Sequence, residues 1–89
     1  MRIRWTLPAV NDLKEISAYI EKSSLAIANK ICRALYDAVQ MLRNHSYLGK
    51  PGKRVETREL VVNAYVVVYR IQSNAIEILR IWHAAQERT

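Results

Sequence analysis

The last third of the chain contains three runs that read as consecutive β-strands, T-R-E-L-V-V, Y-V-V-V-Y-R-I and A-I-E-I-L-R-I-W-H. They are rich in β-branched and aromatic residues, which favour a pleated sheet. Each run carries one arginine, Arg58, Arg70 or Arg80, and His83 closes the last run. Arginine is costly to hold in a small apolar sheet unless it is paired or functional. These strands therefore restrict the fold and also supply the first candidate functional residues.

The first half of the chain predicts a short strand followed by two helices. Ile3 and Trp5 alternate with arginines in a strand-like start that ends at Thr6. Pro8 suits the first turn of a helix, and apolar residues then recur at helical spacing. Ser23 or Ser24 can cap a second helix, which we expect to run to about residue 44. Because the break between the helices is short, they should form a hairpin.

Residues 45–53, H-S-Y-L-G-K-P-G-K, hold both glycines and are expected to form a loop. The resulting order is strand, helix, helix, strand, strand, strand. It predicts an α+β fold, β-α-α-β-β-β, in which the helical hairpin packs on one face of a small, mainly antiparallel sheet. A length of 89 residues indicates a single domain, residues 1–89.

The chain is basic, with fourteen Lys and Arg against eight Asp and Glu and a net charge of +6. A basic surface suits nucleic acid or another acidic partner. Residues 43–58 hold five cations against one carboxylate, Glu56. This segment is either a solvated loop or a contact surface for an anionic partner. Its candidate target-binding residues, with one from the last strand, are Lys50, Lys53, Arg54, Arg58 and Arg80.

Other features exclude several classes of function. No apolar run approaches the roughly 18 residues of a membrane span, and the start of the chain lacks a signal peptide. A lone cysteine, Cys32, cannot form an internal disulfide, which favours the cytoplasm. His45 and His83 lack the spacing of a metal site, and there is no glycine-rich phosphate loop. We therefore expect no cofactor, no metal and no membrane partner.

Two tight turns, at residues 63–64 and 73–74, would set the register of the last three strands. We then expect three cross-strand pairs: Arg58 with Tyr69, Arg70 with Glu77, and Arg80 with Val67. Side chains alternate between the faces of a sheet, so two sets follow. One face would carry Arg58, Tyr69, Arg80 and Trp82, and the other would carry Glu59, Arg70, Glu77 and His83.

This register separates the arginines. Arg70 is explained by an ion pair with Glu77. Arg58 and Arg80 have no such partner, which makes them the better functional candidates. If the chain is a catalyst, His83 would do general acid–base work on a phosphodiester, with arginines stabilising charge. Asp12 is expected to be a solvated charge on the first helix.

The composite pattern resembles the RelE/ParE superfamily of toxins from type II toxin–antitoxin modules. The resemblance covers nearly the whole chain. It rests on R-W-T-L-P-A-V-N-D-L-K-E-I, on L-G-K-P-G after the helices, and on the three strand motifs. It implies a plasmid-stabilisation type of toxin that is neutralised by a cognate antitoxin, whose acidic, extended or helical tail would suit the +6 charge.

The superfamily divides by target. RelE-like members cut mRNA in the ribosome, whereas ParE-like members poison DNA gyrase and lack the nuclease residues. The positions that carry basic or tyrosine side chains in the nucleases hold Thr57, Glu59, Val66, Ala84 and Ala85 here. Only His83 coincides with a catalytic position of some relatives, and the motifs Y-R-I and I-L-R-I-W-H look like the ParE branch.

The sequence therefore predicts a gyrase inhibitor that binds its target without catalysis. The alternative is a ribosome-dependent mRNA endoribonuclease that uses His83 with Arg58 and Arg80. A third class, a plain nucleic-acid-binding module without toxicity, has no recognition motif in its favour.

Overall fold

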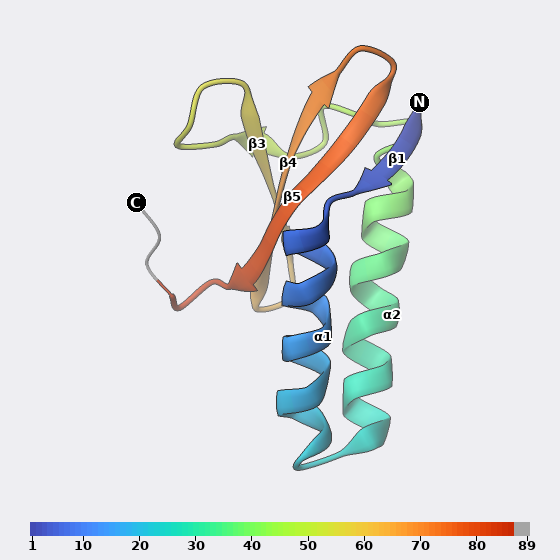
Figure 1. Ribbon diagram of the computed structural model, residues 1–89, viewed down its shortest axis with the longest axis vertical. Helices are drawn as coiled ribbons and strands as arrows, with labels where there is room; N and C mark the ends of the chain where they lie inside the picture. Colours follow the sequence, from blue (N-terminus) through green and yellow to red (C-terminus); the bar gives the residue numbers. More distant parts are fainter. Residues whose placement is uncertain (87–89) are drawn as a thin grey trace.

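A computed structural model describes residues 1–86 of the chain. The elements are β1 (Arg2–Trp5), α1 (Leu7–Glu21), α2 (Leu25–Met41), β2 (Lys50–Pro51), β3 (Thr57–Val62), β4 (Tyr65–Gln72) and β5 (Ala75–His83) (Figure 1). The predicted α+β class and the predicted helical hairpin are confirmed. The second helix ends at Met41, three residues before the predicted end, and a strand that was not predicted, β2, precedes β3.

The five strands form one sheet in the order β1-β5-β4-β3-β2. β1 runs parallel to β5, and the other three pairs are antiparallel, so the sheet is mainly antiparallel as predicted. β1 pairs only with Ala75–Ile78, the first half of β5. Beyond that point α1 packs beside β5 (Figure 1). The N-terminal strand and helix therefore both border the last strand.

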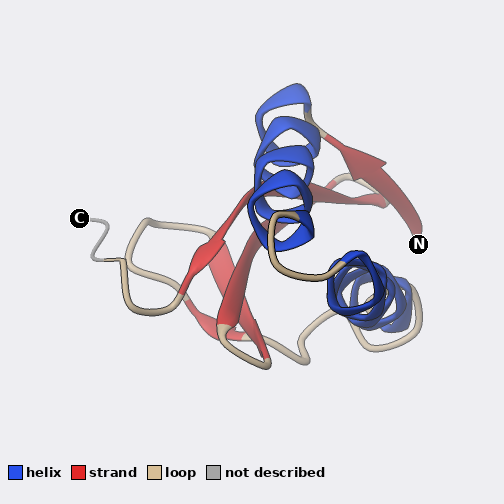
Figure 2. Cartoon of the chain, turned by 90° about the horizontal axis from the view of Figure 1, so that it is seen from below, coloured by secondary structure: helices blue, strands red, loops and turns tan. Residues whose placement is uncertain are grey.

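Side-chain caps define the starts of both helices. Thr6 accepts a hydrogen bond from the backbone N–H of Ala9 at 3.4 Å, and Pro8 occupies the first turn. Ser24 accepts one from Ile27 N–H at 3.1 Å, which confirms one of the two predicted caps. In the view along the long axis, α2 is seen nearly end-on while α1 is inclined, so the two helices cross (Figure 2).

The core lies between the helices and one face of the sheet. Its buried residues are Ala9, Leu35, Val39, Leu42, Leu60, Val67, Tyr69, Ile76, Ile78 and Ile81. Ile3 and Trp5 of β1 pack against this cluster, so the arginines that alternate with them belong to the opposite face. We call that opposite face the open face. Along β3 and β4 it carries Thr57, Glu59, Val66, Val68 and Arg70.

Both predicted turns are present, with Val62 opposite Tyr65 and Gln72 opposite Ala75. Each turn starts at a residue with positive φ, Asn63 at 54° and Ser73 at 55°. The predicted pairs of Arg58 with Tyr69 and of Arg70 with Glu77 are also confirmed.

The predicted pair of Arg80 with Val67 is wrong, because β5 contains a bulge. Tyr69 lies opposite Ile78, but the preceding residue, Val68, lies opposite Arg80. Leu79 is therefore an extra residue on β5, and the alternation of faces shifts by one after it. The shift places Arg80 and Trp82 on the open face and His83 on the helix side, which reverses their predicted positions.

The loop between α2 and β3 is tied to the core by Tyr69, which is fully buried. The Tyr69 hydroxyl donates to Ser46 O at 2.8 Å and accepts from Gly49 N–H at 2.9 Å. A Cβ atom on Gly49 would lie 2.8 Å from both Glu59 O and the Tyr69 ring, so only glycine fits. This contact holds the backbone where β2 begins, beside β3.

Candidate functional site

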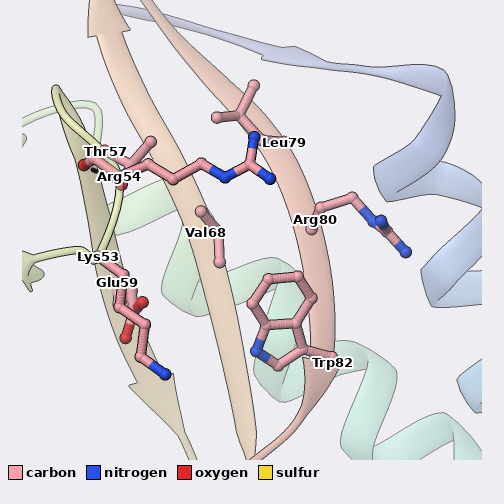
Figure 3. Close-up of a pocket in the computed structure, with 8 residues that line it drawn as sticks. All are labelled: Lys53, Arg54, Thr57, Glu59, Val68, Leu79, Arg80 and Trp82. Atoms are coloured by element: carbon pink, nitrogen blue, oxygen red, sulfur yellow. Dashed lines mark hydrogen bonds between the residues drawn. The ribbon is translucent and has the colours of Figure 1, made fainter. Parts of the chain in front are cut away.

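A hollow of about 460 Å³ lies on the open face (Figure 3). We call it the sheet hollow. It is lined by Lys53, Arg54, Thr57, Glu59, Val68, Leu79, Arg80 and Trp82. Val68 and Trp82 give it an apolar floor, while Lys53 and Arg54 reach it from the loop between β2 and β3. Three predicted target-binding residues, Lys53, Arg54 and Arg80, therefore line this hollow.

The backbone of this loop holds Lys53 and Arg54 over the sheet. Gly52 N–H donates to Thr57 O at 2.8 Å, and the Thr57 hydroxyl donates to Arg54 O at 2.8 Å. A Cβ atom on Gly52 would come within 2.5 Å of the Thr57 hydroxyl, which explains the second glycine of the motif L-G-K-P-G. Figure 3 shows the Arg54 side chain reaching across Val68 toward Leu79.

Arg80 is bound to Asp12 of α1, so the prediction that it lacks a partner is wrong. Its Nε donates to Asp12 Oδ2 at 2.7 Å, and a second guanidinium nitrogen donates to Oδ1 at 3.0 Å. The hydrogen bond to Asp12 raises the pKa of Arg80 above its ordinary value. Figure 3 shows the guanidinium pointing out of the sheet hollow toward α1. Arg80 therefore joins a helix to the sheet.

Asp12 is correspondingly not a solvated charge, as the sequence suggested, since its side chain is only 13% exposed. It also accepts the backbone N–H of Ile81 at 2.9 Å. The position of α1 beside β5 creates this contact, and nothing in the local sequence around residue 12 indicates it.

Arg58 has no carboxylate partner within residues 1–86, but the loop before β2 holds its guanidinium. Its Nε donates to Gly49 O at 2.9 Å, and its guanidinium lies 5.0 Å from the centre of the Tyr47 ring. Both contacts tie it to the loop before β2, and it does not line the sheet hollow. Lys50 lies on β2 opposite Glu59, also outside the lining.

His83 lies at the end of β5, in the same hollow as Arg80 but away from Arg58. Its ring packs edge to face on Tyr65 with centroids 5.3 Å apart, and its Nδ1 accepts the N–H of Ala85 at 3.0 Å. It lines a second hollow, beside Tyr19 and other residues of α1. Of the three candidate catalytic residues, Arg80 and His83 therefore share a hollow, but Asp12 binds the Arg80 guanidinium there, and Arg58 lies elsewhere, against the loop before β2.

The predicted pair of Arg70 with Glu77 is confirmed, and Arg4 of β1 joins it. Arg70 Nε donates to one carboxylate oxygen, and a guanidinium nitrogen of Arg4 contacts the other. Glu77 is 3% exposed, so both arginines satisfy a buried charge. Arg4 was missed because only the parallel pairing of β1 with β5 brings it opposite Glu77.

Residues 1–86 contain no group of three or more His, Cys, Asp or Glu side chains that is placed to hold a metal ion. Among them there is also no helix that is long and apolar enough to cross a membrane.

The model of the family described as the ParE toxin of the type II toxin–antitoxin system parDE matches residues 3–88. The chain belongs to this family. A relative of this ParE-family chain, the candidate toxin Y4kP of Sinorhizobium fredii, is 43% identical over 88 residues, which cover 97% of this chain and 91% of the relative. Toxin RelE2 of Caulobacter vibrioides is 29% identical over 85 residues, which cover 96% of this chain and 97% of that toxin.

Solved structures agree with this assignment. The chain matches one from the chromosomal ParDE system of P. aeruginosa with a TM-score of 0.83 and 25% identity, over 93% of this chain and 95% of that one. It matches a chain from the RelBE2 complex of Mycobacterium tuberculosis with a TM-score of 0.58 and 26% identity, over 92% of this chain and 95% of that one. The ParE-family chain is therefore a type II toxin of the ParE/RelE superfamily, and its α+β fold is that of ParE and RelE toxins.

Proposed function

We propose that this toxin acts in the bacterial cytoplasm by binding DNA gyrase, without cutting RNA. The observation that carries the proposal is that its two nuclease-like arginines are bound at different places, so that only Arg80 lies near His83. Phosphodiester cleavage needs a proton donor or acceptor and cations that converge on one phosphate. Arg58 and Arg80 lie on strands separated by β4, roughly 10 Å apart at about 4.8 Å per strand. Their guanidinium groups are bound at Gly49 and at Asp12.

The composition of the open face points the same way. Thr57, Glu59 and Val66 occupy the positions where the resemblance places the basic groups of a nuclease, and all three share this face. The Glu59 carboxylate lines the sheet hollow, where it would repel a phosphate. A surface of this kind suits binding better than phosphodiester cleavage.

The contact surface for gyrase is proposed to be the sheet hollow with its loop. Lys53 and Arg54 supply positive charge, and Trp82 supplies a large apolar area of the kind that anchors protein interfaces. Lys50 flanks the hollow on edge strand β2. Arg58 and Arg80 support this surface from behind, since Arg58 fixes the loop and Arg80 fixes β5 to α1.

A cognate antitoxin completes the proposed system. The two solved relatives come from ParDE and RelBE2 toxin–antitoxin systems. Here the helices expose large apolar side chains, with Tyr19 74%, Leu25 60% and Met41 53% exposed. Such a surface, on a chain of net charge +6, suits an antitoxin segment that is both apolar and acidic.

The test is expression in a bacterium without the antitoxin, followed by measurement of an SOS reporter and of transcript integrity. Gyrase poisoning predicts SOS induction with intact transcripts. The variant Arg54→Glu should reduce induction, and Arg33→Glu on the exposed surface of α2 makes the same charge change as a control. Transcript cleavage that His83→Ala abolishes would refute the proposal in favour of the ribonuclease.

A further inference from the structure

A second hollow on the open face, about 380 Å³ in volume, is surrounded by three arginines. We call it the arginine hollow. It lies where β1, β5 and β4 meet the turn at residues 73–74, and its lining is Arg2, Arg4, Arg70, Gln72, Ser73, Asn74, Ala75 and Glu77. The proposed contact with gyrase uses none of these residues.

The charge of this hollow exceeds what the fold needs. One arginine neutralises one carboxylate, yet Arg4 and Arg70 both contact Glu77, and Arg2 lines the hollow as well. The Glu77 side chain is 4% exposed, whereas those of Arg4 and Arg70 are 60% and 42% exposed. The carboxylate therefore lies beneath the arginines and orients them, and their outer N–H groups face solvent. The hollow keeps an excess of two positive charges.

The neutral part of the lining is also suited to an anion. Gln72, Ser73 and Asn74 offer amide and hydroxyl donors, and Ala75 is the apolar residue of the lining. Arg, Ser, Asn and Gln side chains are among those that commonly donate hydrogen bonds to phosphate and sugar oxygens. The forked guanidinium group also binds a phosphate through two parallel hydrogen bonds. An apolar peptide or a lipid tail would find little to contact.

The arginine hollow continues into the sheet hollow along the open face. Arg70, in the first, lies opposite Thr57, which lines the second. From β1 to β3 the sheet spans three inter-strand steps, or about 14 Å. That span covers about four base-pair steps of duplex DNA at 3.4 Å each. Arg2, Arg4 and Arg70 thus lie at one end of this span, and Lys53 and Arg54 lie at the other, beside Glu59.

We propose that the arginine hollow binds backbone phosphates of duplex DNA, so that the toxin contacts the DNA held by gyrase as well as the enzyme. The choice of DNA rests on the proposed function, because gyrase acts on duplex DNA. The phosphate chemistry rests on the arginine hollow alone. Binding is independent of DNA sequence, because none of the lining groups needs to reach a base.

The test is binding of the purified toxin to a fluorescent DNA duplex, measured by anisotropy between 50 and 200 mM salt. Each phosphate contact adds about 0.9 to the slope of log affinity against log salt. Arg2→Gln should weaken binding and lower that slope by about 0.9. Over this fourfold salt range the wild type then loses about 3.5 times more affinity than the variant. The control Arg33→Gln, on the exposed surface of α2, should leave the slope unchanged.

Arg2 is the residue of choice because no hydrogen bond or ion pair holds its side chain within residues 1–86, so a side-chain replacement leaves the backbone pairing of β1 with β5 in place. Arg70→Lys, which keeps the charge beside Glu77, provides a second variant and should weaken binding while unfolding cooperatively. Equal losses in Arg2→Gln and Arg33→Gln would overturn the inference, because binding would then follow net charge alone. Equal competition by a polyglutamate of matched charge would overturn it as well.

A parallel assay separates this inference from the proposed function. Gyrase is incubated with DNA and toxin, and the trapped cleavage complex is quantified. If Arg2→Gln traps gyrase as well as wild type and binds free DNA equally well, the arginine hollow has no such role, yet gyrase remains the target. If wild type binds DNA with the predicted slope but never traps gyrase, the phosphate site stands and the proposed target is wrong.

Discussion

Replacement of Tyr69 by phenylalanine tests how the loop before β3 is held. The ring is fully buried, and phenylalanine keeps its shape and packing. Only the hydroxyl is lost, together with the bonds to Ser46 O at 2.8 Å and from Gly49 N–H at 2.9 Å. Because Gly49 is buried, its N–H cannot turn to bulk water once the hydroxyl is gone.

The magnitude follows from these two bonds. A buried donor without a partner costs about 1–3 kcal/mol. The Ser46 carbonyl is only half-buried, so water can replace the hydroxyl there at a smaller cost. We therefore expect Tyr69→Phe to lower the free energy of unfolding by about 2 kcal/mol. For a chain of this size, that corresponds to a fall in Tm of about 8–16 °C.

The assay is urea unfolding followed by circular dichroism, with thermal unfolding beside it. Tyr65→Phe is the matched control, because it makes the same chemical change on the same strand. The Tyr65 ring packs on His83, but within residues 1–86 its hydroxyl has no hydrogen bond. If Tyr69→Phe and Tyr65→Phe lower the free energy of unfolding within about 0.5 kcal/mol of each other, the reasoning about the loop is refuted.

Three further predictions, on five substitutions, test other contacts by thermal unfolding. Asp12→Ala should lower the free energy of unfolding by about 2 kcal/mol, which is about 1 kcal/mol more than Arg80→Ala, because it also leaves the Ile81 N–H without its acceptor. Equal decreases in the two variants would contradict that account. Gly49→Ala should cost about 1–3 kcal/mol, since the added methyl meets backbone and a buried ring, and a neutral result would show that the loop can move away. Ser24→Ala should cost about 1 kcal/mol and Ser23→Ala almost nothing, because only the first caps α2.

Local patterns were sufficient to predict most of the fold. Alternation identified β3, β4 and β5, and the two turns fixed the register between Arg58 and Tyr69 and between Arg70 and Glu77. These features are local because a two-residue turn dictates which residues face each other on either side of it. The cap at Ser24 is local as well.

The candidate site was predicted less well, for two physical reasons. A bulge has no reliable sequence signal, and the extra residue at Leu79 reversed the face of every later side chain of β5. The partners of Arg80 and Arg58 lie 68 and 9 residues away in sequence, on elements whose placement depends on tertiary packing. β2 was missed because a two-residue strand that contains proline shows no alternation.

Because β1 is short, part of one border of β5 has no strand beside it within residues 1–86. This part lies beyond Ile78, and unpaired strand borders recruit other chains. Here Thr6 donates its hydroxyl to Ile78 O at 2.7 Å, and Asp12 accepts Ile81 N–H. The start of α1 thus substitutes for the missing strand with two side chains. These backbone groups of β5 are thereby satisfied within the chain and are not open to pairing with a second chain at this border.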